Sequence, residues 1–203
     1  MPKLVNYEER RRELALAAWR VIRRDGVEGA SVREVAREAG LSTGSLRHYF
    51  RSQSELLTFA MRHVMERVER RAAGVPRPAE PLEAAKVVLA ELLPLDEERR
   101  AENEVWVAFV ARAMVDAPLA ALRDDAYDRL RGACARWITE LRPAGADEER
   151  VLETERLFGL IDGLAVHAAM RPGLATPDLL SAVLENHLEQ LVQAKPTGTA
   201  GEP

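Results

Sequence analysis

The stretch from Ser31 to Phe50 constrains the fold of this chain most strongly, because it encodes two short helices around one tight turn. Ser31 stands three residues before Glu34, the capping-box spacing in which each side chain satisfies the other residue's backbone N–H. Gly40 follows where a helix must end in a left-handed conformation. Ser42 can then cap the next helix. The sequence therefore predicts a capped helix, a glycine turn and a second capped helix.

The second helix is too small and polar to belong to a core, since only Leu46 and Phe50 would face inward. This arrangement is typical of the helix-turn-helix, which places its second helix in the major groove of DNA. Arg47 could pair with a guanine edge or with a phosphate; a solvated helix face is the alternative for Arg47 and His48. The candidate DNA-binding residues here are Ser31, Ser42, Thr43, Gly44, Ser45, Arg47, His48 and Tyr49.

These motifs and their surroundings resemble the DNA-binding domain of the TetR family of bacterial regulators. The resemblance runs from about Glu9 to Met61. It is carried by Ala17-Ala18, Gly26, Ser31-Val32, Val35-Ala36, Ala39-Gly40-Leu41-Ser42, Gly44, Leu46, Phe50, Ser52 and Glu55-Leu56. Two positions depart from the family pattern: Arg47 stands where Tyr is usual, and Gln53 stands where Lys is usual. Because both positions typically contact phosphates in the family, the resemblance adds Gln53 to the candidate DNA-binding residues.

The resemblance implies an all-α protein of about nine helices, with an N-terminal three-helix head and a C-terminal helical body. No segment shows sustained two-residue alternation, which supports the same fold class. We expect a helix-turn-helix domain over 1–52, a connecting helix over 53–73, and a ligand-binding and dimerisation domain over 74–194. A disordered tail is expected over 195–203.

Charge is unevenly distributed along the chain. The formal net charge of −4 would alone discourage an interaction with nucleic acid. Residues 1–71, however, hold 15 Lys and Arg against 10 Asp and Glu, whereas residues 72–203 hold 14 against 23. The asymmetry predicts a basic head that faces phosphates and an acidic body with another role.

The sequence carries no signature of catalysis, of a cofactor or of a metal site. It has no phosphate-binding glycine loop, no nucleophile elbow and no His-Glu-x-x-His. The single Cys134 excludes a disulfide framework and a cysteine-based zinc site. Because there is neither a secretory signal nor an apolar run of the roughly 18 residues that a membrane helix needs, we expect a cytoplasmic protein with no membrane partner.

Bulky side chains of the body and of the connecting helix could line a small-molecule pocket, with an ordinary core as the alternative. The candidate ligand-binding residues are Phe59, His63, Trp106, Phe109, Val110, Met114, Tyr127, Phe158 and Asp162. Asp162 is the single charge between Leu157 and Met170, so it would meet either an arginine or a cationic ligand group. The body loosely resembles the subgroup of the family that contains the choline-responsive repressor BetI, and Trp106 with Tyr127 could surround a quaternary ammonium.

The last two predicted helices have wide apolar surfaces that one body cannot easily bury. A twofold partner that donates the same two helices would cover them in a four-helix interface. The candidate dimer-interface residues are Gly163, Leu164, Val183, His187 and Leu191.

The leading hypothesis is a homodimeric repressor that a small molecule releases from a near-palindromic DNA operator by shifting the connecting helix. An activator or a ligand-independent regulator of the same fold is an alternative that the sequence does not separate. The alternative from another class is a helical small-molecule-binding protein without DNA function. In that protein the N-terminal head would have only a structural role.

Overall fold

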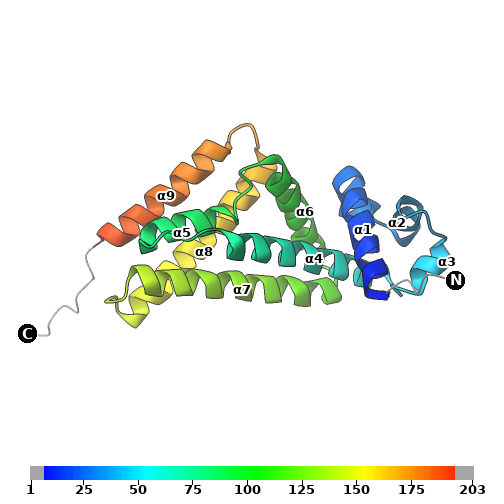
Figure 1. The fold of residues 1–203 in the computed structure, drawn as a ribbon, viewed down its shortest axis with the longest axis horizontal. Helices are drawn as coiled ribbons and strands as arrows, with labels where there is room; N and C mark the ends of the chain where they lie inside the picture. The colour runs from blue at the N-terminus through cyan, green and yellow to red at the C-terminus, as the bar shows by residue number, and fades with distance from the viewer. Residues whose placement is uncertain (1–6, 195–203) are drawn as a thin grey trace, which may run out of the picture. The chain divides into compact units, whose positions relative to one another are not determined.

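The computed structural model describes residues 7–194, and every regular element within them is an α-helix (Figure 1). The described residues form nine helices, which are α1 (Tyr7–Gly29), α2 (Val32–Glu38), α3 (Thr43–Arg47), α4 (Gln53–Gly74), α5 (Pro81–Ala90), α6 (Glu97–Ala113), α7 (Ala117–Leu141), α8 (Asp147–Met170) and α9 (Pro177–Gln193). The prediction of an all-α fold with about nine helices is confirmed. The predicted tail over 195–203 lies outside the described residues.

The turn between α2 and α3 has the geometry that Gly40 predicts. Gly40 has a φ of +67°, the left-handed conformation that a side chain disfavours. The Leu41 N–H donates to the Ala36 carbonyl at 2.8 Å, and the Gly40 N–H donates to the Arg37 carbonyl at 3.1 Å. These two bonds form a Schellman motif, which satisfies carbonyls that the end of a helix otherwise leaves unpaired.

The capping box at the start of α2 is only half formed. The Ser31 Oγ accepts the Glu34 N–H at 3.2 Å, as predicted. The Ser31 N–H, however, donates to the Gly29 carbonyl at 2.8 Å, and the Glu34 carboxylate pairs with Arg37. The predicted return bond from Glu34 to Ser31 is therefore wrong, because both groups have closer partners.

The described chain divides into two compact units that interleave along the sequence. Unit 1 holds the described residues through Glu69 together with Ala101–Asp125, and unit 2 holds Arg70–Arg100 together with the described residues from Ala126 onward. Helices α4, α6 and α7 therefore each contribute residues to both units. The linear division by function that the sequence suggests remains a prediction, since compact units and functional regions need not coincide.

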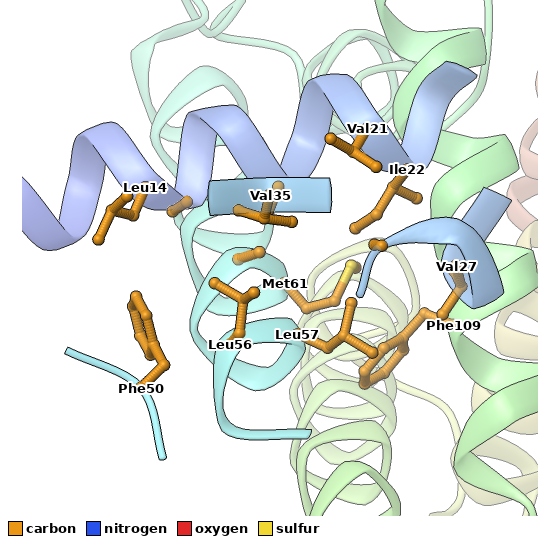
Figure 2. Packing of buried hydrophobic residues seen from close by; sticks show 14 of the residues in the cluster. Leu14, Val21, Ile22, Val27, Val35, Phe50, Leu56, Leu57, Met61 and Phe109 are labelled. Atoms are coloured by element: carbon orange, nitrogen blue, oxygen red, sulfur yellow. The ribbon is translucent and has the colours of Figure 1, made fainter. Parts of the chain in front are cut away.

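Unit 1 has a hydrophobic core that draws on distant parts of the sequence. Buried side chains of α1 to α4 pack together with Val105, Phe109 and Ala113 of α6 and with Leu119 and Leu122 of α7. Figure 2 shows Phe109 among the buried side chains of α1 and α4. Full burial of one such large apolar side chain stabilises a fold by about 1.5–3 kcal/mol. The helix-turn-helix thus shares one core with residues of α6 and α7.

Polar contacts hold the turn between α6 and α7 against the same core. The Ser54 Oγ donates to the Asp116 carboxylate at 2.7 Å, and Arg112 pairs with Glu28 at 3.0 Å. Exposed ion pairs contribute only about 0–1 kcal/mol each. The Arg112–Glu28 pair therefore fixes orientation more than it adds stability, whereas the part-buried hydrogen bond of Ser54 contributes more.

Unit 2 has its own core, formed mainly by α5, α7, α8 and α9. Arg142, at 6% exposure, donates to the Leu191 and Ala194 carbonyls and pairs with Glu149. A cation at this position satisfies the last carbonyls of α9 and complements the helix dipole. Cys134 is fully buried, and burial raises the pKa of its thiol to about 12.

Substituting Gly40 with alanine should destabilise the protein, because a Cβ strains the left-handed backbone by about 1–2 kcal/mol. The free energy of unfolding in urea measures the effect. Gly132 of α7 offers a matched control, since a Cβ there would meet only Arg136 Nη1, at 3.6 Å. The Gly132→Ala variant should equal or exceed the wild type in stability; a Gly40→Ala variant of wild-type stability would contradict the assigned turn.

Candidate nucleic-acid interface

Helix α3 is short and owes its start to one serine. The Ser42 Oγ accepts the Ser45 N–H at 3.1 Å and shares a hydrogen bond with the Ser45 Oγ at 2.9 Å. This is the cap that the sequence predicts. A helix of five residues makes few internal hydrogen bonds, so caps and packing decide whether it forms.

The side chains of α3 divide into a buried anchor and an exposed polar surface. Leu46 has no exposed surface, and it is the buried residue of the helix. Ser42, Gly44, Arg47 and His48 are exposed, whereas Thr43, Ser45 and Tyr49 are partly exposed. The structure therefore presents the polar residues that the sequence singles out on one accessible element.

Other candidate residues already have partners within unit 1. The Ser31 Oγ caps α2, and the Gln53 Nε2 donates to the Ala30 carbonyl at 3.2 Å. Within residues 7–194, neither Arg47 nor His48 has a side-chain hydrogen bond or an ion pair. Arg47 and His48 therefore keep all their side-chain donors available for an outside partner, which Gln53 does not.

The arginines of unit 1 separate into paired and unpaired sets. Arg20 and Arg24 both bond Glu38, and these two hydrogen bonds lower the pKa of its carboxyl group. Six exposed arginines lack an ion pair in the part of the chain that the structure describes: Arg12, Arg23, Arg33, Arg47, Arg51 and Arg62. Unpaired arginines are available to neutralise phosphates.

Sequence reasoning missed two arginines close to α3 in the chain. Arg33 lies in the first turn of α2, and Arg51 lies between α3 and α4. Arg33 has no Asp or Glu three or four positions away with which it could form an ion pair on its helix. The absence of such a partner could have identified Arg33 from the sequence as an unpaired arginine. Arg51 has Glu55 four positions later, but the Glu55 carboxylate accepts the Arg51 backbone N–H at 2.8 Å instead.

The candidate ligand-binding residues fall into both compact units. Phe59, His63, Trp106, Phe109, Val110 and Met114 belong to unit 1, and Tyr127, Phe158 and Asp162 belong to unit 2. Phe109 is 1% exposed as part of the unit 1 core, whereas Met114 is 76% exposed. Phe59 packs against Phe50 with ring centroids 5.4 Å apart. Ligand binding by these six unit 1 residues stays a prediction.

The three unit 2 candidates come together around a carboxyl group. The Tyr127 and Phe158 rings meet edge to face with centroids 5.6 Å apart. Burial raises the pKa of Asp162, and a hydrogen bond with Tyr127 partly opposes that rise. No arginine pairs with Asp162 among the described residues. Of the two partners that the sequence allows, the arginine is therefore not the one present.

Exposed apolar side chains occur on both α8 and α9 of unit 2. Large apolar side chains there are substantially exposed, namely Leu152, Val166, Met170, Leu179 and Val192. Gly163 is exposed, and Leu164 and Val183 are partly exposed. A Cβ placed on Gly159 or Gly163 would meet no atom within 4 Å. On α8, helical spacing puts Leu152, Gly163, Val166 and Met170 on one face. That this face is the dimer interface stays a prediction.

Two candidate interface residues lie deeper in unit 2. Leu191 is 5% exposed in the core. The His187 Nε2 is buried without a hydrogen-bond partner in the described chain. Burial lowers the pKa of His187, because a charged imidazolium would lose its hydration there.

The described residues offer no sign of two other kinds of site. Among residues 7–194, no three His, Cys, Asp or Glu side chains gather in a way that could hold a metal ion. No described helix combines the length and apolar character that spanning a membrane requires.

The capped, exposed α3 behind its glycine turn, with unpaired arginines around it in the sequence, defines a helix-turn-helix DNA-binding protein. Comparison with protein families agrees with this class. Residues 15–58 match the family described as bacterial regulatory proteins, tetR family, and residues 78–193 match the BetI-type transcriptional repressor, C-terminal. This chain belongs to the TetR family of bacterial transcriptional regulators.

Individual relatives extend over nearly the whole chain. The HTH-type transcriptional regulator PksA of Bacillus subtilis is 41% identical over 94% of both chains. BetI of Vibrio vulnificus is 27% identical over 94% of this chain and 96% of its own. The proteins matched are transcriptional regulators and not enzymes.

Solved structures show the same fold. A transcriptional regulator of Rhodococcus sp. Rha1 is 32% identical and superposes with a TM-score of 0.81 over 90% of this chain and 96% of its own. A regulator of Saccharomonospora viridis, solved in complex with choline, is 26% identical with a TM-score of 0.79 over the same shares.

Proposed function

We propose that this protein is a repressor that binds a near-palindromic operator as a homodimer and leaves it when a small molecule binds unit 2. The observation that carries the proposal is the exposed α3, whose Arg47 has no ion pair in the described chain. The description of the matched C-terminal family as a repressor supports repression over activation. Binding to chromosomal DNA would place the protein in the cytoplasm.

The proposed DNA contacts sort into two kinds. Thr43, Ser45 and Arg47 would meet base edges in the major groove, where Arg47 would donate to a guanine. Phosphate contacts would come mainly from His48 and Tyr49, with Arg33 and Arg51 added by their exposure and lack of ion pairs. Backbone N–H groups near Ser31 and Gln53, at the starts of α2 and α4, suit phosphates as well.

The proposed dimer uses the exposed faces of α8 and α9. Gly159 and Gly163 leave open space on that surface, so a second copy could bring a helix close to α8. A twofold axis would present two copies of α3 about 34–36 Å apart, which is one turn of DNA. The exposed Val166 and Met170 support this choice of surface, because a partner would remove them from water.

The proposed effector carries a positive charge and binds at Tyr127, Phe158 and Asp162. A half-buried carboxyl without an arginine partner attracts a cation, and aromatic rings stabilise one by cation–π interaction. The choline bound to the Saccharomonospora viridis regulator supports a ligand of this class. Effector binding would act on DNA binding through helices α4, α6 and α7, each of which has residues in both units. The coupling must be reciprocal, so operator DNA would weaken effector binding.

Replacing Arg47 with alanine should cost about 1–3 kcal/mol of operator binding if the side chain reads a guanine. The measurement is a fluorescence-anisotropy titration with a duplex that the wild-type protein selects from random-sequence DNA. Arg23→Ala is the matched control, because Arg23 is also exposed and lacks an ion pair within residues 7–194 but lies near the far end of α1. Wild-type affinity in the Arg47→Ala variant would show that Arg47 does not contact the DNA.

Replacing Gly163 with leucine should convert the dimer to monomers without unfolding unit 2. The protomer has open space at this position, and leucine favours a helix over glycine by about 1 kcal/mol. Sedimentation velocity at micromolar concentration measures the dimer fraction, and circular dichroism measures the fold. Gly74→Leu, at another open glycine, should stay dimeric. A Gly163→Leu variant that stays dimeric would contradict an interface at this part of α8.

Replacing Asp162 with asparagine should weaken the binding of a quaternary ammonium by roughly 10- to 150-fold, because a charge-assisted contact contributes about 1.5–3 kcal/mol. Choline is the probe, and isothermal titration calorimetry measures its affinity. Asp128→Asn is the control, since Asp128 is an exposed acid on α7. Equal choline binding by wild type and Asp162→Asn, or its absence from both, would reject the cationic site but leave DNA binding untouched.

A further inference from the structure

Two residues of α1 contact the aromatic pair that directly follows α3. The Tyr7 ring stacks on the Tyr49 ring, with centroids 5.2 Å apart and planes inclined by 26°. One turn later, the Arg11 guanidinium lies 5.0 Å from the Phe50 centroid and 5.9 Å from the Tyr7 centroid. Both residues of the pair that closes α3 are therefore held by the first turns of α1.

The Arg11 guanidinium is also placed over α4. It lies 4.3 Å from the centroid of Phe59, whose ring packs against Phe50 at 5.4 Å. The Glu55 carboxylate lies 4.0 Å from the Arg11 Nη2. One guanidinium thus contacts residues of α1, of the segment after α3 and of α4.

Arg11 is more buried than an arginine that is available to bind a phosphate. Its side chain is 22% exposed, and its Nε is buried without a hydrogen-bond partner among residues 7–194. Burial of an unpaired donor is costly, unless ring faces compensate for the lost water. The neighbouring Arg12, by contrast, is exposed.

Helix α3 needs such outside support at its C-terminal end. Its start is fixed by the Ser42 cap and its middle by the buried Leu46. The last bonds that follow it run from the Tyr49 and Phe50 N–H groups to the Leu46 carbonyl, at 2.9 and 3.0 Å. Five helical residues cannot hold this geometry alone.

We propose that Tyr7 and Arg11 form a clasp that positions the C-terminal end of α3 for DNA, and that Arg11 is a positioning residue and not a phosphate contact. The inference rests on the proposed function only in that α3 is taken to enter the DNA groove. The clasp makes the tilt of α3 depend on α1 and, through Phe59, on α4. Loss of the clasp would lower operator affinity without removing any group that touches DNA.

The test compares Arg11→Met with the wild type on the selected duplex, by anisotropy titration at several KCl concentrations. Loss of the cation–π contacts should weaken binding by about tenfold, while the slope of log affinity against log salt stays unchanged. A slope smaller by about 0.9 would mean that Arg11 contacts a phosphate and would overturn the proposal. Wild-type affinity in Arg11→Met would overturn it as well. Arg23→Met is the matched control and should bind as the wild type does.

A second pair of variants keeps the test valid if Arg11→Met folds poorly. Tyr7 is half exposed, so its substitution should change the stability of the core only slightly. Tyr7→Phe retains the stacked ring and should bind normally, whereas Tyr7→Leu should bind several-fold more weakly. Equal affinity of the two variants would contradict the clasp.

Hydrogen exchange supplies a measurement that does not need DNA. In Tyr7→Leu and Arg11→Met, the Tyr49 and Phe50 amides should exchange faster while the amides in the middle of α4 keep their rates. Uniformly faster exchange across unit 1 would show a general loss of stability and would overturn the clasp. A wild-type protein that selects no DNA sequence would refute the proposed function, and the exchange rates would still decide whether the clasp holds α3.

Discussion

The exposed surface that this protein offers to DNA depends on the burial of one leucine. Leu46 has no exposed surface, and a five-residue helix has no other buried anchor of its own. Its neighbours supply the remaining restraints: the left-handed Gly40 before it, the Ser42 cap at its start and the Phe50 ring after it. Because these restraints come from backbone and apolar groups, the polar residues of α3 remain available for recognition.

The features that could be predicted from the sequence are those that depend on nearby residues. A glycine turn, a serine cap and the helical spacing of apolar positions are local, so the sequence alone is enough to identify Gly40, Ser42 and the exposed Arg47. The roles of Arg11 and Phe59 could not be found in this way. Their contacts join residues 48 positions apart in the sequence, and no short pattern specifies such a pairing. The interleaved units escaped prediction for the same reason.

The charged residues show what spacing along one helix can reveal and what it cannot. Arg33 lacks an acidic neighbour at helical spacing, and the structure leaves it unpaired within the described chain. Arg20 depends on a distant partner, Glu38 of another helix, so spacing along one helix could not reveal that pair. Asp162 is the converse case: the sequence allowed an arginine or a cationic ligand group as its partner, and the structure supplies the weaker hydrogen bond of Tyr127. A tyrosine leaves the negative charge uncompensated, which an arginine would not.

The shared core of unit 1 has a consequence for protein synthesis. Its members run from Leu14 to Leu122, so a ribosome that has just finished α4 has synthesised the whole helix-turn-helix without the α6 and α7 side chains that complete its core. At roughly 5–20 residues per second, translation needs several more seconds to supply them. During that interval the nascent chain exposes the faces of α1 and α4 that Phe109 later covers. The DNA-binding end of this protein therefore cannot complete its core until more than half of the chain has been synthesised. Chaperones could bind the exposed apolar faces before Leu122 emerges.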